Sequence, residues 1–333
     1  MSPRLRIFPL FIPHLGCPHA CVFCSQRSVT GFVRPVTPLE IRQTLDRLSA
    51  PVDEIAYYGG SFTALPVSEQ EALLAAAQDA ISAGKAKGLR VSTRPDALDS
   101  TRLELLKRYH VHTVELGAQS MDDGVLLQCG RGHTAADTRR GAAALRERGF
   151  RLILQMMTGL PGASDVSDEA TARELIALRP DGVRIYPTVI LRNTALEALW
   201  RQGKYTEHTV EDAVRLCARL LPLFEAADIP VLRLGLNPTE ALSAGEAAAG
   251  AYHPALGELV RSALYLKAAR EALKSFHGEE AVLGVCSGGV SQLVGQHRKN
   301  LRLLTEEFHL RSLKVRKSSV PEGTVVLLSP VAP

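Results

Sequence analysis

Residues 17–24 read Cys17-Pro18-His19-Ala20-Cys21-Val22-Phe23-Cys24 and closely follow an apolar stretch, Leu5–Ile12. The apolar stretch predicts a buried first strand, which places the three cysteines in a loop at the carboxyl end of that strand. The remaining cysteines are isolated in the chain, and isolated free cysteines usually behave as small buried hydrophobes; they are Cys129, Cys217 and Cys286. The cysteine loop is therefore the strongest indication of the chemistry in this chain.

The spacing of the loop is Cys-x3-Cys-x2-Cys, with an aromatic residue directly before the third cysteine. A four-iron cluster normally takes four thiolates, so this loop would leave one iron without a protein ligand. An open metal position is where chemistry happens, as in catalytic zinc sites. S-adenosylmethionine can chelate that iron through its amino and carboxylate groups, and reduction can then break a carbon–sulfur bond. The spacing resembles the signature of the radical S-adenosylmethionine enzymes, and predicts a [4Fe–4S] cluster on Cys17, Cys21 and Cys24.

A structural zinc site is the main alternative, because the three cysteines with His14 or His19 would form a Cys3His ligand set. Zinc ligands usually come as two separated pairs, and the chain has no second Cys-x2-Cys. Disulfides are disfavoured, because the chain is long and poor in cysteine, unlike small secreted domains. The alternative function is a zinc-stabilised nucleic-acid-binding protein without catalysis.

The composition is that of an ordinary globular protein: 333 residues, 46% hydrophobic and 22% charged, with a formal net charge of +4. This length is enough for a large core. No apolar run reaches the ~18 residues of a transmembrane helix. We therefore expect a cytoplasmic protein with no membrane partner, in a compartment where thiols stay reduced.

Apolar runs alternate with helical patterns through most of the chain. Thr37-Pro38-Leu39-Glu40, for example, is a capping box with proline at the first helical position. Such alternation predicts parallel strands with crossover helices, and we expect an α/β fold with a partial (β/α)6-type barrel. An open doubly wound sheet is the alternative. The predicted strands are Leu5–Ile12, Glu54–Tyr58, Leu89–Ser92, Thr113–Leu116, Arg151–Met157, Gly182–Tyr186 and Pro230–Leu234.

The pattern changes after about Asn237, so we assign residues 1–238 to the barrel and residues 239–333 to a small C-terminal α+β extension. In the extension we expect a linker at 240–251, helices near 255–275 and 291–308, and a β-like tail. Residues 297–317 carry seven Lys or Arg against two Glu. Such a run is either a solvated face or a surface that contacts RNA.

Most of the predicted strands end in polar or glycine-rich residues, and the active sites of barrels lie at that end. Gly59 and Gly60 lack side chains, so the backbone there can approach the methionine amino group. Arg94 suits the methionine carboxylate, because its guanidinium can form a bidentate pair.

The later strands end in larger polar groups. Glu115, Gln119 and Ser120 are expected to hold ribose hydroxyls, although Glu115 is equally explained as half of an ion pair. Arg184 and Tyr186 follow on the sixth strand and are the predicted catalytic residues on the substrate side, although Tyr186 is equally explained by packing inside the barrel.

The order of the motifs resembles the radical domain of the Elongator catalytic subunit and its bacterial relatives, over roughly residues 5 to 270. The motifs are Phe11-Ile12-Pro13-His14, Gly59-Gly60-Ser61-Phe62-Thr63, Thr93-Arg94-Pro95-Asp96, Glu115-Leu116-Gly117-Ala118-Gln119-Ser120, Arg131-Gly132-His133-Thr134, Gly159-Leu160-Pro161-Gly162 and Arg184-Ile185-Tyr186-Pro187-Thr188. The resemblance implies that the partial barrel holds the cluster, with S-adenosylmethionine beneath it. It also implies that Phe23 lies against the adenine, and that Gln119 and Gln155 face the nucleoside.

Two departures limit this resemblance. Ser61 stands where many radical enzymes have an acidic residue, so the amino group must be bound by Ser61 or by backbone carbonyls. The residues after Asn237 show no acyl-CoA site, so the acetyltransferase chemistry of Elongator is not carried over. We expect an enzyme that cleaves S-adenosylmethionine to a 5′-deoxyadenosyl radical, with electrons from a flavodoxin or ferredoxin. The substrate from which it abstracts hydrogen is unassigned, either tRNA or a small metabolite.

Overall fold

The computed structural model describes residues 5–12, 14–32, 34–240 and 242–328, so Pro13 of the first motif lies outside it. Contacts divide the chain into unit 1, Met1–Thr209 with Pro222–Pro254, and unit 2, Val210–Leu221 with Ala255–Pro333. The predicted domain boundary falls earlier, after residue 238. Residues 239–254 group with unit 1 because β9 (Ala247–Gly250) pairs with β7 (Val189–Leu191).

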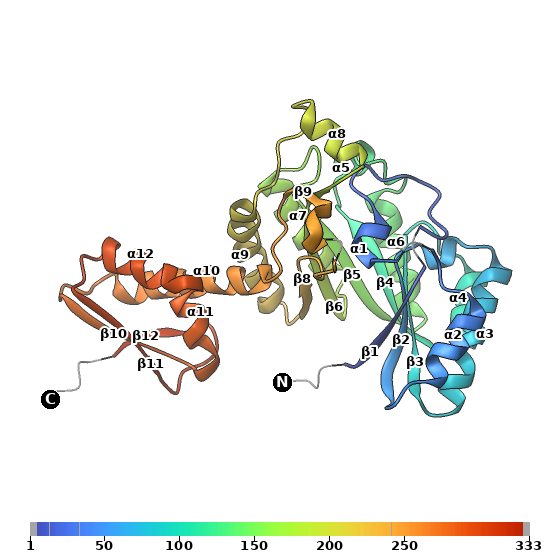
Figure 1. The fold of residues 1–333 in the computed structure, drawn as a ribbon, viewed down its shortest axis with the longest axis horizontal. Coiled ribbons are helices and arrows are strands. Elements are labelled where there is room, and N and C mark those ends of the chain that lie inside the picture. The colour runs from blue at the N-terminus through green and yellow to red at the C-terminus, as the bar shows by residue number, and fades with distance from the viewer. Residues whose placement is uncertain (1–4, 13, 33, 241, 329–333) are drawn as a thin grey trace. The chain divides into compact units, whose positions relative to one another are not determined.

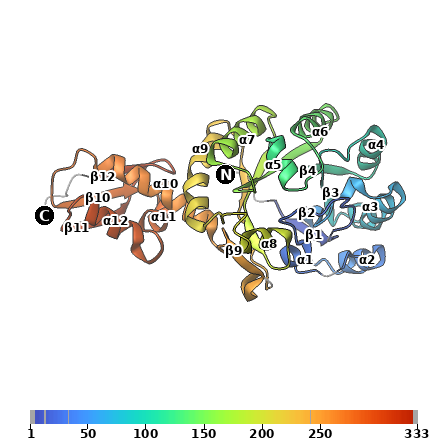
Figure 2. The same ribbon diagram turned by 90° about the horizontal axis from the view of Figure 1, so that it is seen from above.

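Unit 1 is built on one sheet of seven parallel strands, in the order β1-β2-β3-β4-β5-β6-β8. The sheet is curled, and helices follow its outer side (Figures 1 and 2). This arrangement confirms the predicted partial barrel. The strands are β1 (Ile7–Phe11), β2 (Val52–Tyr58), β3 (Ala86–Thr93), β4 (Val111–Gln119), β5 (Arg151–Thr158), β6 (Gly182–Pro187) and β8 (Val231–Leu234).

Helix α2 (Pro38–Asp46) begins where its capping residue, Thr37, predicts. The Thr37 side chain accepts a hydrogen bond from Glu40 N, and Glu40 accepts one from Thr37 N at 2.9 Å, which confirms the capping box. The helices that lie in unit 1 or enter it are α1 (Gln26–Thr30), α2 (Pro38–Asp46), α3 (Val67–Ser82), α4 (Ser100–Arg108), α5 (Asp123–Gln128), α6 (Ala135–Glu147), α7 (Asp165–Ala177), α8 (Ala195–Arg201) and α9 (Val210–Ala226). Among the described residues, no helix is both long and apolar enough to cross a membrane.

The two faces of the sheet differ in polarity. Leu116 of β4 is fully buried and packs toward α6, because its side chain lies 3.5 Å from the position that a Cβ on Gly141 would take. Side chains alternate along a strand. The Glu115 side chain, and a Cβ added at Gly117, therefore point to the concave side of the sheet, which is the side that carries the polar network of Glu115.

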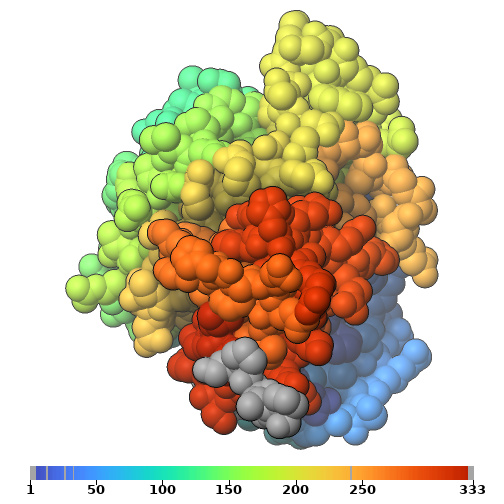
Figure 3. Space-filling model, turned by 90° about the vertical axis from the view of Figure 1, so that its left-hand side faces the viewer, coloured from blue at the N-terminus to red at the C-terminus, as the bar shows by residue number. Residues whose placement is uncertain are grey.

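Unit 2 has a three-stranded sheet in the order β11-β10-β12, with β10 parallel to β11 and antiparallel to β12. Its core joins α10 and α12 to the sheet through side chains such as Leu273, Leu283 and Leu304. The surface of residues 255–328 is coloured orange to red in Figure 3. These elements confirm the predicted α+β extension. They are α10 (Leu256–Leu273), β10 (Glu280–Val285), α11 (Val290–Val294), α12 (Lys299–Glu307), β11 (Ser312–Lys317) and β12 (Val325–Leu328).

Two details of unit 2 differ from the sequence prediction. The single helix expected near 291–308 is wrong, because the chain breaks between α11 and α12 at Gly295, where φ is +73°. Strand β10 was not predicted, since its last residues run into the glycine- and serine-rich segment 284–289.

Candidate active site

The cysteine loop lies at the carboxyl end of the sheet and is anchored on the turn that follows β2. His14 N donates to Gly59 O at 2.8 Å, and Ser61 N donates to Leu15 O at 2.9 Å. Position 60 has no room for a side chain, because a Cβ there would lie 2.3 Å from Leu15 O. The paired glycines thus allow two loops to touch, and the contact of Gly59 and Gly60 with a cofactor stays a prediction.

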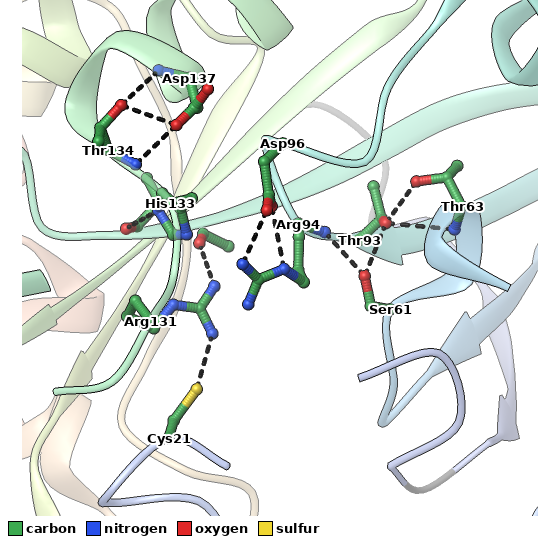
Figure 4. A network of polar contacts seen from close by, with 12 residues as sticks. Cys21, Ser61, Thr63, Thr93, Arg94, Asp96, Arg131, His133, Thr134 and Asp137 are labelled. Atoms are coloured by element: carbon green, nitrogen blue, oxygen red, sulfur yellow. Dashed lines mark hydrogen bonds and ion pairs between the residues drawn. The ribbon is translucent and has the colours of Figure 1, made fainter. Parts of the chain in front are cut away.

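The segment after α5 holds the opposite side of the cysteine loop. Val22 N donates to Cys129 O at 3.1 Å, and Arg131 Nη1 donates to Cys21 Sγ at 3.4 Å. Arg131 Nη2 donates to Gly117 O at 2.7 Å, so one guanidinium ties Cys21 to the end of β4 (Figure 4). Arg131 belonged to a motif in the sequence, but nothing local indicated this contact.

None of the three cysteines of the loop is in a disulfide; Cys17 is exposed, and Cys21 and Cys24 are half-buried. Within the described ranges, no three His, Cys, Asp or Glu side chains gather closely enough to hold one metal ion. That finding concerns a single ion, whereas an iron–sulfur cluster takes each thiolate on a different iron.

A hydrogen-bonded cluster joins the ends of β2 and β3. Ser61 Oγ lies 3.1 Å from Thr93 Oγ1 and accepts a hydrogen bond from Arg94 N at 3.3 Å. The Arg94 guanidinium binds both carboxylate oxygens of Asp96, through Nε and Nη2, at 2.9 Å each (Figure 4). Asp96 therefore fixes the orientation of Arg94. The predicted contacts of Ser61 and Arg94 with methionine stay predictions.

Glu115 is the centre of a buried charge network on the concave face. Its side chain is fully buried, and burial alone would raise its pKa. Arg184 and Arg90 instead hold the pKa of Glu115 below its ordinary value. Both carboxylate oxygens are engaged inside the protein, and the predicted contact with ribose stays a prediction. The donors to Glu115 are Arg90 (2.6 Å), Gln155 (2.7 Å), Arg184 (2.9 Å) and Tyr58 (3.0 Å).

The network extends across the sheet, because Arg90 Nε also donates to Glu54 at 2.8 Å. Tyr186 lies near Arg184, and its pKa is raised by burial, an effect that Arg184 opposes. Unpaired charges are costly inside a protein. Ionisable residues within apolar strands are therefore the signal that could have revealed this network; they are Glu54, Arg90, Glu115 and Arg184.

Gln119 is the last residue of β4, and Ser120, which follows the strand, lies in a different environment. Gln119 has a φ of +65° at a register shift between β4 and β5, and its Oε1 is buried with no hydrogen-bond partner in the described structure. Its amide and the Arg131 guanidinium both lie beside Gly117. Ser120 Oγ accepts from Asp122 N at 3.1 Å and so supports the following turn.

Phe23 packs into an apolar cluster with Val125, Cys129 and Leu160, so its predicted contact with adenine stays a prediction. Leu160 also lines a cavity of about 280 Å³ between residues 159–168 and residues 204–208. There Asp168 accepts from Gly159 N at 2.9 Å, and burial raises the pKa of Asp168 to about 7.

The residues at this end of the sheet fit a [4Fe–4S] cluster with S-adenosylmethionine. Three thiols on one loop form a donor set that leaves one iron open. Gln119 Oε1 and Arg131 Nε are buried beside the loop, and within the described residues neither has a hydrogen-bond partner. Buried polar atoms of this kind normally meet a ligand or a water.

Comparison with known families agrees with this geometry. Residues 11–175 match the radical SAM superfamily, and residues 180–265 match the Radical_SAM C-terminal domain. The chain belongs to the radical S-adenosylmethionine superfamily. It is an enzyme of that class, which uses a [4Fe–4S] cluster and S-adenosylmethionine.

The resemblance to Elongator is confirmed by sequence relatives. Elongator complex protein 3 of Homo sapiens is 29% identical over 262 residues, which cover 63% of this chain and 48% of the relative. The tRNA uridine(34) acetyltransferase of Dehalococcoides mccartyi is 28% identical over 233 residues, which cover 58% of this chain and 51% of the relative. The chain thus spans about half the length of the curated relatives it matches.

Solved structures share the fold. The archaeal Elp3 of Methanocaldococcus infernus, with an N-terminal deletion, superposes with a TM-score of 0.61 at 23% identity. The match covers 79% of this chain and 63% of that one. SuiB of Streptococcus suis superposes with a TM-score of 0.51 at 16% identity, covering 72% and 51%.

Proposed function

We propose that this chain reductively cleaves S-adenosylmethionine and abstracts hydrogen from an RNA substrate, with tRNA as the favoured RNA. The observation that carries the proposal is the loop with three cysteines, none of them in a disulfide, held at the carboxyl end of a curled parallel sheet. When bound, the cluster and S-adenosylmethionine supply the electron and the carbon–sulfur bond from which a 5′-deoxyadenosyl radical forms.

The chain's own residues bind and orient these groups. Cys17, Cys21 and Cys24 would ligate the cluster, and Arg131 fixes Cys21 against β4 through Gly117 O. Gln119 Oε1 would accept a hydrogen bond from the nucleoside, which satisfies a buried acceptor.

The concave face forms the substrate side of the proposed site. The ion pairs of Glu115 with Arg90 and Arg184 hold these side chains in place, so Arg184 and the neighbouring Tyr186 would present fixed polar groups to the substrate. A fixed and largely buried wall also limits the access of water to a reactive species.

The substrate and the reductant are the finer parts of the proposal. RNA is favoured because tRNA uridine(34) acetyltransferases are among the relatives of this chain. A reductant is required by radical S-adenosylmethionine chemistry. A flavodoxin or ferredoxin is the proposed donor, because iron–sulfur clusters of plant-type ferredoxins reach potentials of about −400 mV. A cytoplasmic location would keep the thiols reduced.

The test is anaerobic reconstitution followed by reduction with dithionite in the presence of S-adenosylmethionine. We expect about four irons and four sulfides per chain, and 5′-deoxyadenosine as a product. Cys21→Ala should lose both the full cluster and the product. The matched control is Cys286→Ala, which removes a thiol of unit 2 and should retain both.

Two results would overturn the proposal. One is zinc without sulfide in protein purified and reconstituted without oxygen, which would favour the zinc-stabilised nucleic-acid-binding alternative. The other is a complete cluster that leaves S-adenosylmethionine intact after reduction.

A further inference from the structure

Unit 2 carries a basic surface that the radical chemistry does not use. Arg311 pairs with Glu280, and Glu307 pairs with Arg270. The other six cations of residues 298–317 are exposed, and in the described structure none of them forms an ion pair. They are Arg298, Lys299, Arg302, Lys314, Arg316 and Lys317. An exposed cluster of one sign, without internal partners, favours an anionic partner.

The order of elements around this surface is β10, α11, a four-residue loop, α12 and β11, with β10 and β11 parallel. In KH modules, a Gly-x-x-Gly loop between two helices clamps the backbone of four nucleotides. The loop here is Gly295-Gln296-His297-Arg298. Gly295 has a φ of +73° and Arg298 a φ of +59°, so Arg298 adopts the left-handed conformation that a second glycine would favour.

Hydrogen bonds hold the two ends of the loop to the rest of unit 2. Asn300 is buried, and its Nδ2 donates to Ser262 O at 3.0 Å and to Gln292 O at 3.3 Å. Gly295 N donates to Ser291 O at 2.9 Å, and a Cβ on Gly295 would come within 3.0 Å of the Asn300 side chain. A loop already fixed in one conformation loses little entropy when it binds a ligand.

The loop also places positively charged side chains at the N-terminus of α12. His297, Arg298 and Lys299 are exposed at the N-terminus of the nine-residue helix α12, whose N-cap makes no side-chain hydrogen bond. The helix dipole adds to this positive potential. Lys314 and Arg316 lie on the face of β11 opposite the core of unit 2, because Leu313 and Val315 pack against that core, so they do not belong to the surface of this loop. Phosphates spaced along a nucleic-acid backbone match the exposed cations of the loop and of the first turn of α12.

We propose that the loop 295–298 and the first turn of α12 bind the sugar–phosphate backbone of single-stranded RNA. The inference rests on the proposed function in one respect, because it assigns the RNA substrate a binding surface in unit 2.

The experiment measures binding of a short fluorescein-labelled single-stranded RNA to the full chain by fluorescence anisotropy. Arg298→Glu with Lys299→Glu should weaken binding at least about tenfold at roughly 0.1 M salt. The slope of log affinity against log salt should become shallower by about 0.7 for each lost phosphate contact. Lys267→Glu with Lys274→Glu, which reverses two exposed charges in α10 and at its C-cap, is the matched control and should bind like the wild type. If the loop variant fails to fold by circular dichroism, Arg298→Gln with Lys299→Gln replaces it.

Equal weakening in the double variant of Lys267 and Lys274 and in the loop variant would overturn the proposal, since both reverse two charges and the effect would then be one of net charge. Wild-type protein that binds vesicles of anionic lipid but not RNA would also overturn it. Anisotropy needs neither a reduced cluster nor S-adenosylmethionine. Failure to bind RNA therefore counts against this inference, whereas failure to form 5′-deoxyadenosine counts against the proposed function.

Discussion

At the scale of single residues, the glycines around the cysteine loop are fixed by lack of space. A Cβ on Gly16 would lie 2.2 Å from Ser61 O, and one on Gly132 would lie 2.3 Å from the His19 ring. From the sequence, Gly59 and Gly60 were expected to allow the close approach of a cofactor. In the structure, they allow the close approach of the neighbouring cysteine loop. These contacts join residues far apart in the chain, so local patterns could not reveal them.

Gly60→Ala tests this explanation. The added Cβ would meet two backbone oxygens, Leu15 O at 2.3 Å and Ile12 O at 2.6 Å, and backbone atoms move only at a cost. We expect a loss of about 1–3 kcal/mol of stability and a lower iron and sulfide content after anaerobic reconstitution. Gly288→Ala is the control, because a Cβ there meets nothing within 4 Å. Wild-type cluster content in Gly60→Ala would show that the cysteine loop does not depend on this contact.

Arg131→Met tests the link between Cys21 and the sheet. The guanidinium donates to Cys21 Sγ, and a cationic donor to a cluster thiolate stabilises the more negative, reduced cluster. We therefore expect a more negative midpoint potential in a redox titration followed by electron paramagnetic resonance. The rate of 5′-deoxyadenosine formation should fall about 10- to 100-fold. Arg173→Met, an exposed change on α7, should alter neither value. An unchanged potential in Arg131→Met would contradict the proposed hydrogen bond.

At the scale of elements, the strands of unit 1 could be predicted because each has an apolar core a few residues long. Those apolar side chains indicate that the strand is buried against the helices. The polar side chains of the concave face, such as Glu54, Arg90 and Glu115, are explained only by the ion pairs that they form across strands. Such pairs need the strand order, which a single sequence does not contain.

Glu115→Ala measures how much the network contributes to stability. Without this carboxylate, Arg184 loses its buried partner and Arg90 keeps only Glu54, so unpaired positive charge remains inside the sheet. We expect a loss of about 3–5 kcal/mol in the free energy of unfolding. Urea unfolding of unit 1 can be followed by Trp200, the only tryptophan of the chain. Glu147→Ala, an exposed change at the end of α6, should cost less than about 0.5 kcal/mol. Equal losses in the two variants would show that the network adds no stability.

At the scale of the whole molecule, the alternation of strands and helices predicted the barrel, and the cysteine spacing predicted the class of enzyme. The sequence pattern predicted the helices and strands of unit 2 less accurately. The chain bends at Gly295 partly because Asn300 is held by Ser262 of α10, a contact between distant residues. Strand β10 was not predicted because glycines and serines follow it, and such residues in a sequence usually indicate a turn.

The two units should respond to different ligands. A ligand stabilises only the part of a protein that binds it, by about 2.7 kcal/mol at 100 times its Kd. Unit 2 has its own apolar core, and all core residues of that cluster lie in residues 265–325. S-adenosylmethionine added to reconstituted protein should therefore slow hydrogen exchange in residues 14–24 and at the ends of β2 to β5. A short single-stranded RNA should instead slow exchange in residues 290–317. Protection of residues 290–317 by S-adenosylmethionine alone would contradict this separation, because the basic surface would then respond to a ligand of the cysteine loop.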